Sequence, residues 1–403
     1  MITVAEAVRI IQNNVLALPI EEVALTDAVG RVLREPVYAD RDFPPFHRVM
    51  MDGIAIQFSS FRAGKDTYPI ADAQLAGDAP KTLVNSESCL EVMTGAVLPP
   101  GTDTVIRYED LQIIEQKGQR YAQITAAPQR AWQNVHQKGS DRKATDLLIP
   151  VGVLISPAEI AVIATVGKTS LKVTVRPRVA IIATGDELVA VSEQPLPHQI
   201  RQSNSYMLQA ALGQKGIKAE RFHLHDNKIA LLKEVNNILH QFDVLLLSGG
   251  VSKGKADFIP DVLVELGVQK LLHEVAQRPG KPFWFGRLPD GPVVFALPGN
   301  PVSTFVCQYK YVQLWLRASL GACPALLPQV VLAQEVTFKP HLTYFLPVKL
   351  EVNAKGAYVA QPLSTGGSGD FAALLEADGF LELPRDKTEF FAGEQFSFIS
   401  FRN

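Results

Sequence analysis

The sequence predicts a multidomain protein of the α/β plus β class, and three features support this assignment. Its 403 residues exceed what one hydrophobic core usually serves, so several domains are expected. In residues 176–327, continuous apolar strands that end on glycine alternate with helical patterns, which predicts a mostly parallel buried sheet. Short strand patterns separated by turns lie on both sides of this region and predict smaller β-rich domains.

The N-terminal part of the chain is expected to be one module interrupted by an insertion. Residues 1–46 begin the module, because apolar residues recur with helical spacing from Val4 to Val15 and a strand with a proline-stiffened connection follows. Residues 47–131 are short strand-like pieces between glycines and prolines, which predicts an inserted β-rich domain. Residues 132–175 then complete the first module.

The central and C-terminal parts differ in their hydrophobic pattern. VAIIATG, FDVLLLSGG and PVVFALPGN are continuous apolar strands, and segments such as SYMLQAALGQKG alternate with them as helices. Residues 328–403 return to alternating strands with turns, which predicts a small β-barrel or a β-sandwich.

Composition and charge narrow the function classes. Hydrophobic residues make up 47% and charged residues 20% of the chain, which is typical of a soluble globular protein. The formal net charge of -2 gives no global positive field, so no nucleic-acid partner is expected. No apolar stretch approaches the ~18 residues that span a bilayer, and the N-terminus lacks the pattern of a secretory signal. We therefore expect a cytoplasmic protein with no membrane partner.

Glycine-rich turns follow three strands of the α/β domain, and ligands of open α/β sheets bind at such carboxyl ends. Glycines let the backbone approach a ligand closely, and successive N–H groups in these turns favour anions. The residues expected to contact the ligand at these turns and at neighbouring helix starts are Gly185, Ser203, Asn204, Ser248, Gly249, Gly250, Val251, Ser252, Pro298, Gly299, Asn300 and Ser303.

The stretch FALPGNPVSTF shows how one such turn is built. Pro298 and Gly299 end a strand, and Asn300 is a typical helix cap. Pro301 suits the first helical position because that nitrogen needs no hydrogen bond. The N–H groups of the helix start, with the hydroxyl of Ser303 in the first turn, favour a phosphate or another oxyanion.

Acidic side chains at the same strand ends indicate a metal ion. Asp186, Glu187 and Asp257 would repel a phosphate, whereas Mg²⁺ is typically held by one or two carboxylates together with phosphate oxygens. The turns and acids together predict a Mg²⁺-bound phosphate ester; ordinary turns with capping acids are the alternative. Arg278 and Lys281 lie on a proline-rich turn and offer two cations to an oxyanion, although exposed basic turns are usually only solvated.

Other motifs carry less information. Ser203, Asn204 and Asp226 lie at helix starts, where they act as caps or as ligands. By spacing alone, MMDG, MTG and KGSD are ordinary glycine turns, and the His223-x-His225 pair does not predict a zinc site. No Walker loop occurs, which disfavours P-loop hydrolysis. The three cysteines fit a reducing compartment, and each is expected to be buried.

Taken in order, an extended set of motifs resembles the molybdopterin molybdenumtransferase family, the MoeA and gephyrin E-domain type. The motifs are FPPFHRVMMDGIAI, VMTGAVLPPGTDTVIRYED, VHQKGSD, ATGDELV, SNSYML, SGGVSKGKADF, RPGKPFWFG, LPGNPVS and GGSGDFAALLEADG. An ordered set that covers nearly the whole chain is very specific.

The resemblance implies a four-part architecture. An elongated N-terminal domain (1–46 and 132–175) carries an inserted β-rich domain (47–131), a molybdopterin-binding α/β domain (176–327) follows, and a β-barrel (328–403) ends the chain. It also implies a homodimer in which a cleft lies between the α/β domain of one subunit and the N-terminal and inserted domains of the other.

The family's reaction inserts molybdenum from molybdate into adenylylated molybdopterin, with Mg²⁺-dependent release of AMP. The family's functional positions fall on Asp52, Thr94, Asp141, Glu187, Asp226, Asp257, Arg278 and Lys281. Our hypothesis for this chain is that Asp186, Glu187 and Asp257 bind Mg²⁺ and the pterin phosphate. The glycine turns would bind the phosphates, and Arg278 and Lys281 would bind molybdate or the phosphoryl charge.

Alternative functions stay open. The same α/β domain would also serve to adenylylate molybdopterin with ATP or to cleave a nucleotide pyrophosphate, although the additional domains argue against both. A gephyrin-like scaffold is disfavoured because the chain has no long linker or fused partner domain. A molybdopterin adenylyltransferase and apo-molybdoenzymes are the partners that the family reaction implies. This chain departs from common family residues at His47, Arg48, Gln202 and His273.

Overall fold

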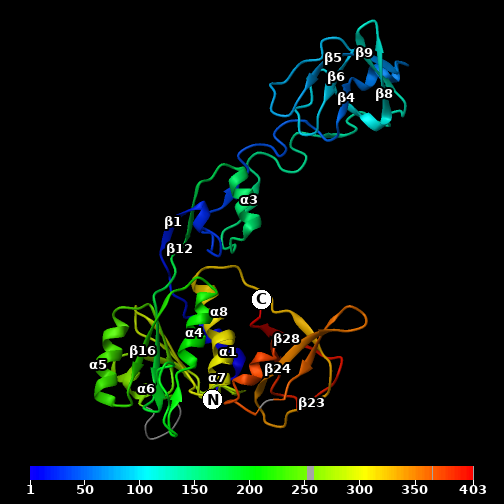
Figure 1. Ribbon diagram of the computed structural model, residues 1–403. Helices are drawn as coiled ribbons and strands as arrows, with labels where there is room; N and C mark the ends of the chain where they lie inside the picture. The colour runs from blue at the N-terminus through cyan, green and yellow to red at the C-terminus, as the bar shows by residue number, and fades with distance from the viewer. Residues whose placement is uncertain (252–257, 365, 403) are drawn as a thin grey trace. The chain divides into compact units, whose positions relative to one another are not determined.

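The computed structural model describes residues 1–251, 258–364 and 366–402. The chain divides into two compact units, whose elements are labelled in Figure 1. Unit 1 comprises Met1–Arg34, Gly152–Ser156 and Ser170–Asn403, and unit 2 comprises Glu35–Val151 and Pro157–Thr169.

A mostly parallel sheet forms the centre of unit 1. Its strands lie in the order β16 (Ala219–Leu224), β13 (Val179–Thr184), β17 (Val244–Ser248), β21 (Val293–Leu297), β20 (Trp284–Arg287) and β18 (Gln269–His273). The first four are parallel, and β20 runs antiparallel to both of its neighbours. Every residue of β13, β17 and β21 is buried, which explains why these strands are continuous apolar runs.

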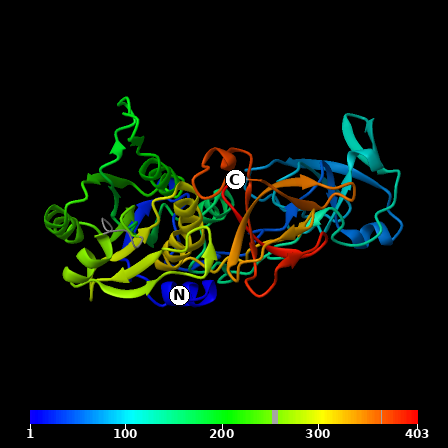
Figure 2. The ribbon, with the colours of Figure 1, turned by 90° about the horizontal axis from the view of Figure 1, so that it is seen from below.

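Helices cover both faces of this sheet, as Figures 1 and 2 show. The helices on one face are α1 (Val4–Gln12), α4 (Asn204–Gly213), α7 (Pro301–Cys307), the π-helical η3 (Gln308–Val312) and α8 (Gln313–Ser319). The helices on the other face are α5 (Lys228–Leu239) and α6 (Ile259–Glu265). This arrangement confirms the predicted α/β domain.

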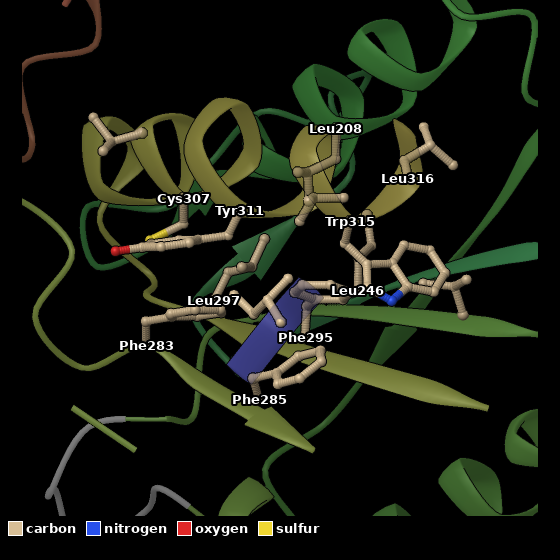
Figure 3. Close-up of a cluster of buried hydrophobic side chains, with 14 of the residues drawn as sticks. Leu208, Leu246, Phe283, Phe285, Phe295, Leu297, Cys307, Tyr311, Trp315 and Leu316 are labelled. Atoms are coloured by element: carbon tan, nitrogen blue, oxygen red, sulfur yellow. The ribbon is translucent and has the colours of Figure 1, made fainter. Parts of the chain in front are cut away.

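The core between the sheet and the α7–α8 segment is strongly aromatic (Figure 3). The ring of Phe295 in β21 lies 4.8 Å from Phe285 and 5.6 Å from Trp315, measured between ring centroids. Tyr311 stacks on Phe283 at 4.7 Å. Close packing of these rings fixes η3 and α8 against the sheet, and because both directly continue α7, it helps to position the turn between β21 and α7.

The C-terminal strands of unit 1 close into a β-barrel, so the sandwich alternative is wrong. The strand order is β19 (Gln277–Arg278), β24 (Thr343–Val352), β25 (Tyr358–Pro362), β22 (Gln329–Leu332), β28 (Gln395–Ser400) and β26 (Gly379–Leu383), and β26 also pairs with β24. The smaller elements nearby are β23 (Val336–Thr337), β27 (Glu389–Phe390) and η4 (Ala372–Leu375). Because β19 belongs to this sheet, the turn that carries Arg278 is joined directly to the barrel.

Two short strand pairs complete unit 1. They are β1 (Ile20–Ala24) with β12 (Ser170–Thr174), and β14 (Leu188–Val189) with β15 (Ile200–Arg201); η1 (Leu25–Asp27) follows β1. The first pair joins segments that are far apart in the sequence, as an interrupted N-terminal module requires.

Unit 2 is built on a second sheet. Its strands lie in the order β7 (Thr104–Arg107), β4 (Gly53–Ile56), β6 (Cys89–Val92), β5 (Thr67–Gln74), β9 (Gln119–Ile124) and β8 (Leu111–Gln116). Two strand pairs, β2 (Val37–Tyr38) with β11 (Leu147–Ile149) and β3 (Arg48–Val49) with β10 (Val135–His136), accompany α2 (Phe58–Arg62), η2 (Tyr108–Asp110) and α3 (Pro157–Thr165). The inserted β-rich region is therefore confirmed.

Two local expectations need correction. The first helix ends at Gln12 instead of continuing to Val15, and the backbone N–H of Asn13 closes its last turn. Cys323 is exposed in the segment after α8, whereas Cys89 and Cys307 are buried as expected. Among the described helices, none has both the length and the apolar character needed to cross a membrane.

Candidate functional site

A cavity of about 580 Å³ lies at the carboxyl ends of β13, β17 and β21 in unit 1. The strand-end residues predicted as ligands converge on it: Gly185, Glu187, Ser203, Asn204, Asp226, Ser248, Gly249, Gly250, Val251, Pro298, Gly299, Asn300 and Ser303 all line its wall. Ser252 and Asp257 were also predicted as ligands, and they lie outside the described residues. Thr184, Arg201, Gln202 and Ser205 line the same cavity but were not predicted as ligands.

Gly249 shows why the turn after β17 requires glycine. Its φ is +102°, and a Cβ atom there would lie 2.4 Å from the carbonyl oxygen of Thr184. The backbone of this turn therefore packs directly on the end of β13, and a larger residue would separate the two strand ends.

Asn204 connects the strand ends. Its Nδ2 donates to the hydroxyl of Ser248 at 2.9 Å and to the carbonyl of Gly299 at 2.8 Å. Its Oδ1 and the hydroxyl of Thr184 are buried and have no hydrogen-bond partner in the described part of the chain. Ser203 occupies the N-cap position of α4 without a side-chain capping bond. Capping therefore does not account for this pair of residues, and the unpartnered Oδ1 is available to a donor on a ligand.

The start of α7 differs from its prediction. Asn300 is the N-cap residue, but its side chain makes no capping bond and donates instead to the hydroxyl of Ser368 at 2.9 Å. The backbone N–H of Val302 donates to the carbonyl of Ser368 at 3.1 Å. One of the N–H groups expected to face an anion is therefore occupied by a segment of the barrel domain.

The carboxylates divide into two groups. Glu187 and Asp226 line the cavity, and Asn227, not Asp226, caps α5 by accepting from the N–H of Ala230. Asp186 does not line the cavity; its Oδ1 lies 3.0 Å from Nδ1 of His225 and accepts from the N–H of Asp226 at 3.3 Å. These contacts, with His225 the largest cause, hold the pKa of Asp186 below its ordinary value.

The residues present fit a magnesium site at this cavity. Within the described residues, no group of three His, Cys, Asp or Glu side chains is arranged to hold a metal ion alone. Mg²⁺ needs fewer protein ligands, because it usually takes one or two carboxylates and completes its shell with phosphate oxygens and water. Glu187 and Asp226 supply two carboxylates at one cavity.

A second cavity, of about 610 Å³, adjoins the first in unit 1. The residues Pro282, Asn300 and Ser303 line both, and Arg278, Lys281 and Ser368 line the second. Both predicted cations thus belong to a cavity shared by the α/β and barrel domains.

Gln277 supports the turn that carries these cations, and the sequence pattern did not reveal it. Its Nε2 donates to the carbonyl of Pro279 at 3.0 Å, and its Oε1 accepts from the hydroxyl of Tyr311. Burial raises the pKa of Tyr311 well above its ordinary value, so this hydroxyl remains a neutral donor. The aromatic core therefore extends to the cation-bearing turn.

Unit 2 brings the MDG and MTG turns together. Oδ1 of Asp52 accepts from the N–H of Thr94 at 2.6 Å and from its hydroxyl at 2.7 Å. These bonds, the backbone bond first, hold the pKa of Asp52 below its ordinary value. At Gly53, φ is +157° and a Cβ atom would lie 1.8 Å from the carbonyl oxygen of Ile106, so the turn needs glycine.

The GSD turn is tied to the same strand segment. Oδ1 of Asp141 lies 2.8 Å from Nε2 of His136, and Nδ1 of that ring lies 3.1 Å from the guanidinium of Arg48. Val49, the next residue, accepts from the N–H of Gly95, which follows Thr94. Residues 48–52 thus connect all three motifs of unit 2.

Comparison with known proteins gives consistent matches over the whole length. The MoeA N-terminal region (domain I and II) matches residues 2–167, the probable molybdopterin binding domain matches 180–318, and the MoeA C-terminal region (domain IV) matches 329–401.

Individual relatives match at full length. A molybdopterin molybdenumtransferase of Synechocystis sp. (strain ATCC 27184 / PCC 6803 / Kazusa) is 39% identical and covers 99% of this chain and 100% of its own length. One of Staphylococcus epidermidis is 30% identical over 97% of this chain and 94% of its own. The crystal structure of the molybdopterin biosynthesis MoeA protein of Pyrococcus horikoshii OT3 has a TM-score of 0.85, 26% identity and full coverage of both chains.

Proposed function

Because the chain belongs to the MoeA family of molybdopterin molybdenumtransferases, we propose that it transfers molybdenum from molybdate to the dithiolene of adenylylated molybdopterin and releases AMP. The observation that carries this proposal is the pair of adjoining cavities in unit 1. One combines glycine turns with carboxylates and the other carries two cations, and three residues line both. A phosphorylated organic substrate and a small oxyanion would therefore lie next to each other.

The first cavity would bind the pterin and its phosphates. The glycine turn after β17 lets the backbone approach phosphate oxygens closely. The buried Oδ1 of Asn204 is an acceptor without a partner among the described residues, which suits an N–H donor such as those of a pterin ring. The hydroxyl of Thr184 offers a second polar contact at the same depth.

Glu187 and Asp226 would hold Mg²⁺ together with substrate phosphate oxygens, and Asp257 would join them. Bound Mg²⁺ neutralises charge on the phosphate groups and favours departure of the adenylate. Asp186 would act indirectly, because its carboxylate is already engaged by His225 and by the backbone of Asp226.

The second cavity would bind molybdate. Arg278 and Lys281 supply positive charge, and the hydroxyls of Ser303 and Ser368 on the same wall supply donors to its oxygens. Fixed donors in a preorganised site stabilise a tetrahedral oxyanion without reorganising during the reaction.

The homodimer belongs to the same proposal. We propose that Asp52, Thr94 and Asp141 of one subunit complete the site of the other. A molybdopterin adenylyltransferase would supply the adenylylated substrate, and apo-molybdoenzymes would receive the product.

The test is AMP release from the purified protein with adenylylated molybdopterin and Mg²⁺, with and without molybdate. We expect molybdate-dependent release that Glu187→Gln and Asp257→Asn abolish. Glu351→Gln, at an exposed glutamate of the barrel, is the matched control and should behave as the unmodified protein. Pyrophosphate formed from ATP would instead support an adenylyltransferase. No release from the folded protein under any of these conditions would contradict the proposal.

A further inference from the structure

The Arg48–His136–Asp141 contacts in unit 2 define the protonation of the central ring. A guanidinium has only donors, so the Nδ1 of His136 that faces Arg48 at 3.1 Å must accept. The ring proton then lies on Nε2, which donates to Oδ1 of Asp141 at 2.8 Å. A second proton on Nδ1 would abolish the contact with Arg48 and bring two cations together. Arg48 and Asp141 therefore select the same neutral tautomer of His136, one from each side of the ring.

This arrangement leaves the two oxygens of Asp141 in different environments. Oδ1 accepts from His136 and from the hydroxyl of Ser140 at 3.2 Å. Oδ2 has no hydrogen-bond partner among the described residues, and the side chain is 54% exposed, compared with 27% for His136. One oxygen is thus held by the protein while the other faces outward.

We propose that Arg48 and His136 are positioning residues that orient Asp141, so that its Oδ2 is presented to the substrate. The proposal rests on the proposed function, in which Asp141 serves the reaction. It assigns a role to Arg48, at one of the positions where this chain departs from common family residues.

The charged surroundings agree with this role. The groups that face His136 are Arg48 from β3 and Asp141 from the GSD turn. His47, beside Arg48, is turned elsewhere: its Nδ1 accepts from the N–H of Lys138, and its ring lies 4.7 Å from Trp132. No second acid therefore competes with Asp141 for the Nε2–H of His136 among these contacts.

The first experiment determines the tautomer of His136 and needs no substrate. The ¹⁵N chemical shifts of selectively labelled histidines in the full chain distinguish Nε2–H from Nδ1–H rings. We expect His136 to be the Nε2–H tautomer in the unmodified protein and a mixture of tautomers in the double variant Arg48→Met/Asp141→Ala, which removes both partners of the ring. Arg130→Met, at an exposed arginine of unit 2, is the control and should leave the spectrum unchanged. An Nδ1–H ring in the unmodified protein, or an unchanged ring in the double variant, would overturn the proposal.

The second experiment measures how the loss of His136 affects catalysis through Asp141. His136→Leu should lower kcat/KM for AMP release by roughly 10- to 100-fold, because the carboxylate is no longer oriented. It should also move the acidic limb of the pH profile to higher pH, since the hydrogen bond from His136 lowers the pKa of Asp141. His136→Gln should recover part of the activity, because an amide can both donate to Asp141 and accept from Arg48.

The two readouts separate this proposal from the proposed function. ¹³C titration of the Asp141 carboxyl, assigned with Asp141→Asn, reports the pKa change in His136→Leu without catalysis. If the unmodified protein releases no AMP, the function is wrong while the tautomer and the titration still decide the positioning role. A folded His136→Leu protein with unchanged Asp141 titration and pH profile would exclude that role.

Discussion

In unit 2, the pKa of Asp52 depends on a single threonine, Thr94. Thr94 supplies two hydrogen bonds to one carboxylate oxygen, and both favour the ionised form. Thr94→Val removes the hydroxyl bond and retains the backbone bond, so the pKa of Asp52 should rise partway toward its ordinary value of 3.8. ¹³C titration of the carboxyl measures this change.

The sign of the stability effect follows from the same shift. The folded-state pKa is depressed, so the bonds stabilise the fold above the ordinary pKa, and this contribution disappears as the pH falls through the folded-state pKa. Thr94→Val should therefore reduce the free energy of unfolding at neutral pH and have less effect in acid. Thr337→Val, an exposed threonine, is the control. If Asp52 had the same pKa in Thr94→Val as in the unmodified protein, the hydroxyl of Thr94 would not be a cause of its lowered pKa.

Gly249 allows backbone strain and steric collision to be separated. Gly249→Ala should cost about 1–3 kcal/mol in the free energy of unfolding through its positive φ, and it should further impair AMP release because the Cβ meets the carbonyl of Thr184. Gly118→Ala is the matched control: φ there is +79°, but a Cβ atom would have no neighbour within 4 Å. Urea unfolding and AMP release measure the two effects. Equal losses of activity in both variants would show that the collision is unimportant.

At the scale of elements, the aromatic core should determine the stability of the α/β domain. Phe295 is fully buried and contacts three aromatic rings, those of Phe283, Phe285 and Trp315. Phe295→Ala should reduce the free energy of unfolding by about 3–5 kcal/mol, because it leaves a cavity in a close-packed region. Urea unfolding followed by tryptophan fluorescence measures the loss. Leu326→Ala, at a residue 97% exposed, should have almost no effect, and similar losses in the two variants would contradict this account.

At the scale of the whole molecule, the proposal that each site takes residues from two subunits predicts complementation. Asp52→Asn and Glu187→Gln should each be inactive alone. In a mixed dimer, one site carries both substitutions and the other carries neither. Random mixing of the two chains by co-expression should therefore restore about a quarter of the activity, since half of the dimers are mixed and each has one intact site.

The controls for complementation use the same assay. Co-expression of two chains that both carry Glu187→Gln should restore nothing. Absence of recovery in the mixed sample, with mixed dimers verified by mass spectrometry, would mean that Asp52 and Glu187 act within one subunit.

Local patterns determined the fold class and most of the first cavity. Buried parallel strands must be apolar throughout, and glycine is required where a positive φ brings one backbone against another. Both features can be recognised in the sequence from Val179 to Gly185 and from Val244 to Gly250. The carboxyl ends of parallel strands share one edge of a sheet, which is why the predicted ligands at those ends converge.

Tertiary structure decided what each side chain does after the strands are assembled. Asn300 is bonded to Ser368, 68 residues away, as is the neighbouring Val302, and the pattern PGNP contains no signal of these contacts. Likewise, Glu187 and Asp226 line the cavity while Asp186 is held by His225, and the Arg48–His136–Asp141 contacts join residues from two segments that are far apart in the sequence. Hydrogen bonding between distant segments depends on which ones the fold brings within about 3 Å. Residue spacing along one chain does not encode that distance.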